Sequence, residues 1–292
     1  MGCKIIMSLD KKKEAELFYE KAVELHKEHK KEQAIEYIEK SIKINQEINY
    51  LPGLAETIYY KGIIYHETSH DVEKALNFFE EALLLYRKIN DEKGIGKALY
   101  NIGWTYRDKG ELDKALKYTK ENLTLQEKLG DNDRIAWAHV SIGWVYTAQK
   151  EYDLAEDEYQ KSIDIFKERK DEKGLAFTLR FRATSWKHRE EYQIALKYFQ
   201  ECLRLFNKLG NIWQTAITLN EIAEIYESKE EIGKAIEFYE QMLAICEEIE
   251  RTNVIVNILE HLAKLYEKTK DLKKAEEYLT RLRKRKNSKD KK

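Results

Sequence analysis

The stretch that decides the fold spans residues 97–129, KALYNIGWTYRDKGELDKALKYTKENLTLQEKL. Apolar and small residues stand at i, i+3, i+4 and i+7, namely Leu99, Ile102, Gly103 and Tyr106. This spacing lines one face of an α-helix. A turn signal at 108–110 interrupts the pattern, and a second amphipathic run follows. The segment therefore predicts two helices joined by a short turn.

The same helix pair recurs along the chain. A small residue marks the first helix of each repeat, at Ala22, Gly62, Gly103, Gly143, Ala183, Ala223 and Ala263. Another marks the second helix, at Ala34, Ala75, Ala115, Ala155, Ala195, Ala235 and Ala275. From the third repeat on, both series advance by 40 residues. Paired helices approach to about 8–10 Å between axes, so Gly or Ala at the crossing leaves room for the partner helix.

This period predicts a leader, seven helical hairpins and a basic tail. The expected boundaries are 1–10 for the leader, 11–50, 51–92, 93–131, 132–171, 172–211, 212–251 and 252–286 for the repeats, and 287–292 for the tail. The first helical pattern begins near Leu9.

Composition supports an all-α protein. Pro52 is the only proline in 292 residues, and hydrophobic residues make up 42%, enough for a continuous core. The formal net charge of −1 provides no overall attraction to nucleic acid. The high lysine and glutamate content is typical of hyperthermophiles, and an AT-rich genome produces the same bias.

The sequence is that expected of a cytoplasmic protein. It contains no signal-peptide-like apolar segment and no run of about 20 apolar residues that could span a membrane. The three cysteines, Cys3, Cys202 and Cys246, form neither a CxxC pair nor a disulfide framework. We expect reduced thiols, with the last two buried.

The repeats resemble the tetratricopeptide family, whose pattern is W-x2-L-G-x2-Y followed by A-x3-F. The matching positions are Leu99-x2-Ile102-Gly103-x2-Tyr106, His139-x2-Ile142-Gly143-x2-Tyr146 with Ala155-x3-Tyr159, and Leu219-x2-Ile222-Ala223-x2-Tyr226 with Ala235-x3-Tyr239. The resemblance covers about residues 11–286 and implies a right-handed superhelical solenoid.

The period of 40 departs from the usual 34, and the closing proline is absent. We expect the extra residues to lengthen the second helix of each repeat. The long repeat is similar to those of kinesin light chains, Pins-type adaptors and bacterial peptide-sensing regulators. That branch binds peptides or proteins without sharing one partner.

In such solenoids the first helix of each repeat lines the concave surface. The stripe opposite its packing face is therefore the candidate groove. The residues that we expect to bind a partner there are Tyr59, Tyr100, Trp104, Arg107, Trp137, Trp144, Phe177, Arg180, Lys187 and Asn220. Aromatic and arginine side chains dominate interface energetics, so a partner with apolar anchors and an acidic stretch fits them. The alternative is that the long helices bury these aromatics between repeats.

Motifs for catalysis are weak. His66-Glu67-Thr68-Ser69-His70 matches the H-E-x-x-H zinc-hydrolase pattern, but it falls where a helix ends. No Gly-rich phosphate loop and no G-x-S-x-G elbow occurs. We therefore expect a non-catalytic protein with no cofactor and no metal, and keep a zinc hydrolase as a remote alternative.

The basic end of the chain, residues 281–292, leaves a second alternative open. It would cap the last helix, or it would contact nucleic acid or an acidic partner. The function that the sequence favours is a protein-interaction scaffold, with self-association also open.

Overall fold

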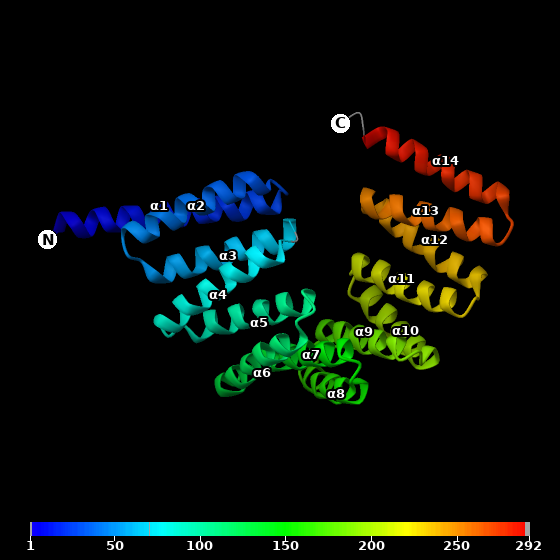
Figure 1. The fold of residues 1–292 in the computed structure, drawn as a ribbon, viewed down its shortest axis with the longest axis horizontal. Helices are drawn as coiled ribbons and strands as arrows, with labels where there is room; N and C mark the ends of the chain where they lie inside the picture. Colours follow the sequence, from blue (N-terminus) through cyan, green and yellow to red (C-terminus); the bar gives the residue numbers. More distant parts are fainter. Residues whose placement is uncertain (1, 70, 290–292) are drawn as a thin grey trace. The chain divides into compact units, whose positions relative to one another are not determined.

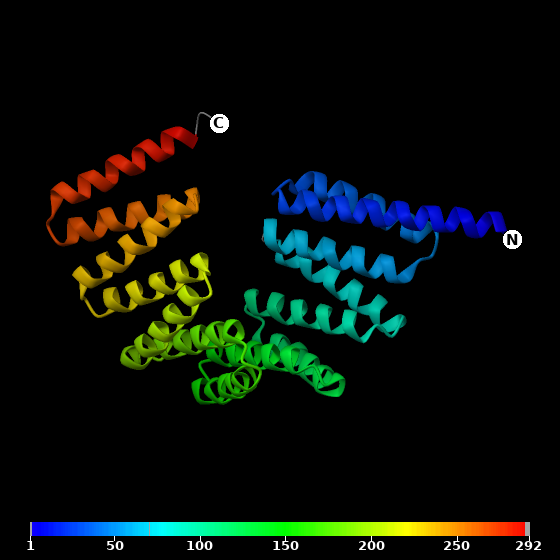
Figure 2. The same cartoon turned by 180° about the vertical axis from the view of Figure 1, so that it is seen from behind.

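The computed structural model describes residues 2–69 and 71–289, with side chains over 9–67 and 71–286. Across that described part, all regular structure is α-helical, as Figures 1 and 2 show from opposite sides. Neighbouring helices are separated by two or three residues. The prediction of an all-α chain of helical repeats is confirmed.

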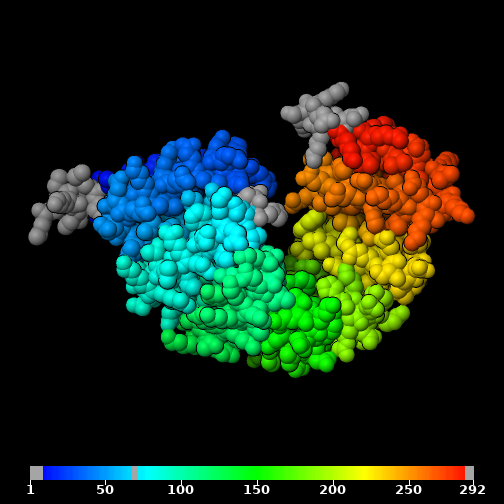
Figure 3. All heavy atoms as spheres, in the orientation of Figure 1, coloured from blue at the N-terminus to red at the C-terminus, as the bar shows by residue number. Residues whose placement is uncertain are grey.

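The chain forms two compact units, which meet in sequence between Gln149 and Lys150. The first unit contains α1 (Gly2–Lys27), α2 (Lys31–Glu47), α3 (Leu51–Ser69), α4 (Val72–Lys88), α5 (Glu92–Asp108), α6 (Leu112–Leu129) and α7 (Asn132–Ala148). The second contains α8 (Tyr152–Glu168), α9 (Glu172–His188), α10 (Tyr192–Lys208), α11 (Ile212–Ser228), α12 (Ile232–Glu248), α13 (Thr252–Lys268) and α14 (Leu272–Lys289). Inside each unit every helix packs on the next one along the chain, and side chains fill the space between them (Figure 3).

The joints explain the period of 40. A residue with positive φ recurs every twenty positions, at Gly110, Gly130, Lys150, Lys170, Glu190, Gly210, Glu230, Glu250 and Lys270. This left-handed residue closes a helix C-terminus: the Glu111 amide donates to the Tyr106 carbonyl at 2.9 Å. Both helices of a hairpin consequently have nearly the same length, 17 residues in α9 and in α10. The expectation that only the second helix is longer is wrong, because each helix has to cover its neighbour along its full length.

Acidic or amide caps start most of the first helices. Asp91, Asp131 and Asp171 each accept a hydrogen bond from the backbone amide three residues ahead, and Asn211 does the same at 3.3 Å. Such caps satisfy amides that have no partner inside the helix. The first helix differs from expectation, since α1 begins at Gly2 rather than near Leu9.

The small residues lie where the sequence predicts tight crossings. A Cβ atom on Gly103 would stand 2.7 Å from the Thr119 methyl carbon of α6, and one on Gly62 would stand 2.7 Å from the Phe79 ring of α4. One turn further along, the Tyr106 ring is buried and its hydroxyl donates to Glu80 at 2.8 Å. The hairpin core therefore depends on glycine at the helix crossing, where no side chain would fit, and on a large aromatic ring one turn further along.

Two further features of the described residues bear on the sequence expectations. Cys202 and Cys246 are buried free thiols, as expected, while the side chain of Cys3 lies outside the described ones. Among the described helices, none combines the length and apolar character needed to cross a membrane.

Two helical glycines provide a matched test of this packing. A Cβ atom on Gly174 would lie 2.4 Å from the fully buried Phe166 ring, whereas one on Gly233 would meet nothing within 4 Å. We expect Gly174→Ala to lower the free energy of unfolding by about 1–3 kcal/mol through overpacking. Gly233→Ala should raise it by about 0.5–1 kcal/mol, because alanine loses less backbone entropy. Denaturant titration of both variants measures the difference, and equal effects would contradict the assigned crossing.

Candidate functional site

The first unit brings four of the expected aromatics together on α5 and α7. Tyr100, Trp104, Trp137 and Trp144, which we call the aromatic stripe, are all partly exposed. The rings of Tyr100 and Trp104 lie 5.8 Å apart, and the Trp104 indole donates to the Ser141 hydroxyl of α7 at 3.1 Å. The stripe thus spans two successive first helices, as the repeat register predicts.

Arg107 extends the stripe. Its guanidinium lies 3.7 Å from the Trp104 ring centroid and 5.6 Å from that of Trp144. The same group donates to the Asp108 carboxylate at 3.0 Å. Burial alone would raise the pKa of Asp108, but hydrogen bonds from His66 and Arg107 bring it below its ordinary value. Arg107 is therefore a cation–π partner whose charge is already balanced.

Tyr59 does not belong to this surface. Its ring is 9% exposed and packs in the core against Phe79 and Tyr86 of α4. Burial raises the pKa of Tyr59 to about 12, and Asn101 donates to its hydroxyl at 2.7 Å. The expectation of an exposed side chain is wrong here, because α4 supplies two rings that close over this position.

A cavity lies beside the stripe, near a position where the repeat pattern changes. Three helices bury an aromatic ring at one repeat position, at Tyr86, Phe166 and Phe206. The equivalent residue of α6 is Gln126, shorter and polar, and its amide nitrogen would lie 2.4 Å from a Cβ atom on Gly96. Nearby, a cavity of about 330 Å³ is lined by Gly96, Tyr100, Asn122, Asp133, Arg134 and Trp137. Two members of the stripe therefore border a hollow that the repeat pattern alone does not predict.

The second unit carries the remaining expected residues. Phe177 of α9 is partly exposed and packs edge-on against Phe206 at 5.3 Å. Lys187 donates to Glu221 at 2.5 Å and to Glu224 at 2.6 Å. Asn220 of α11 donates to Glu224 at 2.6 Å. It also lines a cavity of about 370 Å³ with Ile217, Glu224, Tyr239, Met242, Val254, Asn257, Ile258 and His261.

Arg180 stands apart among the basic residues of the expected groove. It contacts the rings of Phe177 and Phe181, and its Nε atom is buried without a hydrogen-bond acceptor. It forms no ion pair with any residue that the structure describes. Burial lowers the pKa of the Arg180 guanidinium, and the charge of Glu221 acts in the opposite direction. A cation taken out of water without a paired anion is unfavourable unless a ligand supplies one.

Most basic residues of the expected groove are therefore less available to an acidic partner than the sequence suggests. Lys97, Arg107 and Lys187 are held by Glu56, Asp108 and the pair Glu221 and Glu224. These contacts join successive repeats or cap helix ends. Only at Arg180, among these four basic residues, does the described structure leave the positive charge without a carboxylate.

The first two residues of the H-E-x-x-H motif contact different helices. His66 lies 3.4 Å from Asp108 of α5, and Glu67 lies 3.6 Å from His26 of α1. His70 lies outside the described residues, so the pair of histidines is not seen together. Within the described part, no group of three His, Cys, Asp or Glu side chains is arranged to hold a metal ion.

The basic C-terminus is partly engaged inside its own unit. Arg281 donates to Glu247 at 2.9 Å, Arg285 lies 3.7 Å from the same carboxylate, and Arg283 donates to Glu276 at 2.9 Å. The helix α14 continues to Lys289, three residues into the expected tail. The described arginines of the basic end are therefore bound to carboxylates of the last hairpins.

Sequence reasoning missed one group of residues at the N-terminal end. Lys12, Glu16, Tyr19 and Glu20 of α1 line a cavity of about 330 Å³ that also reaches α2 and α3. Glu16 and Tyr19 stand six and three residues before Ala22, the same phase as Glu56 and Tyr59 before Gly62. Extending the groove stripe into the first repeat would have found both.

Comparison with known proteins agrees with the repeat geometry. A tetratricopeptide-repeat model matches residues 54–128 and 94–168, and a model of the soluble NSF attachment protein matches 139–290. The two overlap over 139–168, so they describe one continuous series of hairpins. The chain is a tetratricopeptide-like repeat protein. No curated protein matches it.

Solved structures share the fold of this tetratricopeptide-repeat chain at low identity. The apo form of RapI is 17% identical with a TM-score of 0.68, over 96% of this chain and 100% of that one. The Rap conjugation gene regulator of plasmid pLS20, in complex with the Phr* peptide, is 21% identical with a TM-score of 0.61, over 91% and 72%. Kinesin-light-chain-like repeats from Podosopora anserina are 12% identical with a TM-score of 0.58, over 67% and 96%.

The contrast between Arg180 and Arg182 predicts opposite effects on stability. Arg182 donates through Nε to Glu156 at 2.9 Å and through Nη1 to Gln160 at 3.2 Å, whereas Nε of Arg180 has no acceptor among the described residues. Arg180→Leu should leave the free energy of unfolding unchanged or raise it, because it removes a partly exposed cation whose buried Nε has no hydrogen-bond acceptor. Arg182→Leu should lower it by at least about 1 kcal/mol, since it leaves the Glu156 carboxylate unpaired. Thermal melts of the two variants decide the matter; a larger loss for Arg180→Leu would show that Arg180 is a structural residue.

Proposed function

We propose that the protein is a non-catalytic scaffold that binds a peptide segment or a partner protein along its first helices. The residues proposed to carry the contact are the aromatic stripe with Arg107 in the first unit, and Phe177, Arg180, Lys187 and Asn220 in the second. The fold supports a role of this kind, because a stack of hairpins presents one extended face without a closed active site.

The observation that carries the proposal is the state of Arg180. An arginine with buried Nε, no ion pair among the described residues and two aromatic neighbours is costly for folding. A carboxylate from a partner would accept hydrogen bonds from the unused N–H groups of the guanidinium and would balance its positive charge. We infer that the partner presents an aspartate, a glutamate or a chain terminus at this point.

The aromatic stripe supports apolar anchors in the same partner. Tyr100, Trp104, Trp137 and Trp144 are partly exposed, and two of them border a cavity. Half-buried tryptophan and tyrosine rings remove a large apolar area from water while losing little side-chain freedom. The competing interpretation is that these rings serve only the core; the burial of Tyr59 fits it, whereas the partial exposure of the stripe supports a binding role.

The comparisons favour peptides among partners. One solved Rap structure of this fold holds the Phr* peptide, and another is a complex with competence and sporulation factor. These ligands are bound by those proteins. At sequence identities of 21% and 16%, the similarity to this chain shows a shared fold and not a shared ligand. The two complexes show that proteins of this fold bind peptides, which is the kind of partner proposed here.

A catalytic role has less support from the residues. One solved neighbour is named aspartyl phosphate phosphatase F from Bacillus subtilis. The three cavities described above combine no Ser or Cys nucleophile with a histidine base within the described side chains. We therefore propose that binding is the activity of this chain.

Selection from a random peptide library tests the function. Peptides retained by the protein should be enriched in aromatic or aliphatic residues together with aspartate or glutamate. Their affinity should fall by about 2 kcal/mol in Arg180→Leu and in Trp137→Ala, as for interface hot spots. Calorimetry with the selected peptides provides the measurement.

Arg204→Leu is the control, because it removes the same charge from an exposed site on α10. Peptides that bind all three variants as tightly as the parent protein would place the interface elsewhere. A library that yields no binding peptide would contradict the proposed function itself.

A further inference from the structure

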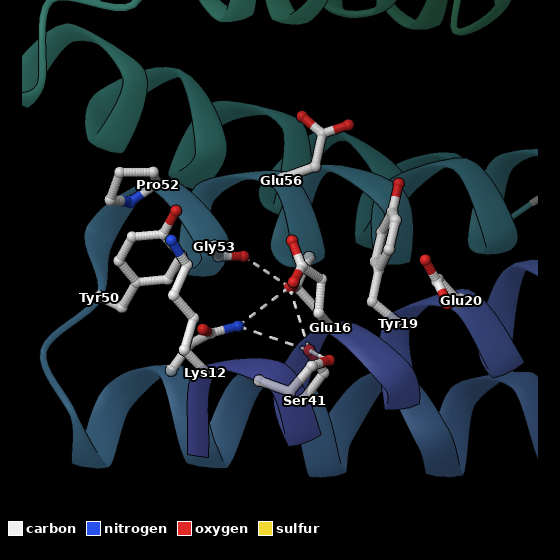
Figure 4. A pocket seen from close by; sticks show the side chains of 12 residues that line it. Lys12, Glu16, Tyr19, Glu20, Ser41, Tyr50, Pro52, Gly53 and Glu56 are labelled. Carbon is white, nitrogen blue, oxygen red and sulfur yellow. Dashed lines mark hydrogen bonds between the residues drawn. The ribbon is translucent and has the colours of Figure 1, made fainter. Parts of the chain in front are cut away.

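The cavity at the N-terminal end of the first unit has a composition unlike the rest of the groove. It measures about 330 Å³ and lies among α1, α2 and α3 (Figure 4). Carboxylates approach it from two helices, Glu16 and Glu20 from α1 and Glu56 from α3. A cavity of this size matches the small end of ordinary ligand pockets.

The negative charge at this cavity is only partly balanced. Glu16 and Glu20 stand at i and i+4 on α1, both exposed and neither in an ion pair with a described side chain. Like charges at this spacing repel one another on a helix. Glu56 is better satisfied, since Lys97 lies 3.3 Å away and the Tyr86 hydroxyl donates to it at 2.7 Å.

The single cation among the lining residues is directed elsewhere. The Lys12 ammonium lies 4.2 Å from the centroid of the Tyr50 ring. Tyr50 is the largest cause that raises the pKa of Lys12, and Glu16 contributes less. Lys12 therefore leaves both α1 carboxylates with acceptor sites for a further positive charge.

The floor of the cavity contains an unused acceptor. Asn45 is 2% exposed, and its amide nitrogen donates to Ser41 at 3.4 Å and to Thr57 at 3.3 Å. Its carbonyl oxygen accepts no hydrogen bond from the described residues. A Cβ atom on Gly53 would lie 2.6 Å from that oxygen, so a side chain at this position would displace it. Asn45 lines the cavity, and the unused acceptor capacity of its carbonyl oxygen suits a ligand that carries N–H groups.

The Tyr19 ring completes the wall of the cavity. Burial raises the pKa of Tyr19, and the negative charge of Glu56 raises it further, so the phenol stays neutral. Figure 4 shows the ring standing between Glu16, Glu20 and Glu56. An aromatic face beside carboxylates suits a cation on an apolar stem.

We propose that this cavity binds the side chain of an arginine or lysine from the partner segment. The guanidinium or ammonium would pair with Glu16 and Glu20, one N–H would reach the Asn45 oxygen, and the methylene stem would lie along Tyr19. The inference rests on the proposed function, because Glu16 and Tyr19 continue the first-helix stripe into the first repeat. It adds a basic residue to a partner whose other features are apolar anchors and a carboxylate.

The experiment uses N-acetyl-arginine methylamide as the probe and the citrulline analogue as its neutral isostere. NMR spectra of the full chain with ¹³C-labelled tyrosine follow the rings of Tyr19 and Tyr50, assigned by Tyr→Phe substitution. We expect the arginine probe to shift both signals in a saturable, salt-sensitive manner, and the citrulline probe to have at most one tenth of the affinity.

Glu16→Gln/Glu20→Gln should weaken the arginine probe tenfold or more. Glu14→Gln/Glu32→Gln removes the same charge from exposed positions outside the cavity and should change the affinity less than twofold. If Glu16→Gln/Glu20→Gln changes the melting temperature, the single variant Glu20→Gln replaces it in the binding measurement. Equal shifts from citrulline, or unchanged binding in the Glu16→Gln/Glu20→Gln protein, would overturn the inference. So would Mg²⁺ or Ca²⁺ displacing the probe at equimolar concentration, since the cavity would then be a metal site.

Failure of the two proposals can be told apart. Selected peptides without enriched arginine or lysine, whose affinity ignores Glu16→Gln/Glu20→Gln, would overturn this inference and leave the proposed function standing. A cavity that binds the arginine probe in a protein for which the library yields no peptide would support a cation site and contradict the proposed function.

Discussion

The close crossing of two helices inside each hairpin is the constraint on which the rest of the structure depends. At Gly103 and Gly62 there is no space for a side chain, because Thr119 and Phe79 of the partner helices occupy it. Once two helices are this close, the larger residues beside the crossing have to interlock, and Tyr106 does so with its hydroxyl on Glu80. The packing face of every first helix is then set, and so is the opposite face that remains for a partner.

The turns between helices are uniform, so the same close helix packing recurs along the chain. Left-handed residues return every twenty positions, so successive helices have matched lengths and each hairpin offers its neighbour the same surface. Most of these residues are not glycine, although a left-handed backbone costs a side-chain-bearing residue about 1 kcal/mol or more. Packing on both sides of the joint outweighs that cost, in the same way that it outweighs the low helix propensity of Gly103 and Gly174.

Function in such a regular stack resides where a repeat departs from the shared pattern. Gln126 replaces the buried ring found at Tyr86, Phe166 and Phe206, and a cavity borders the aromatic stripe there. Arg180 forms no ion pair with a described residue, while Lys97 and Lys187 join one repeat to the next through theirs. Each departure costs stability without improving the core, which is the pattern expected of residues retained for binding.

The sequence by itself determined the helical hairpins, their small-residue crossings and the face that stays outside the core, because these follow from periodicity and side-chain volume within one repeat. Only the tertiary structure decided which residues of that face are available. Tyr59 is covered by rings from α4, Lys187 is held by two glutamates from α11, and Arg180 is left unpaired. Burial and ion pairing depend on side chains 20 to 40 residues away that reach the position from neighbouring helices. The residue pattern of one helix does not reveal which side chains of neighbouring helices will contact it.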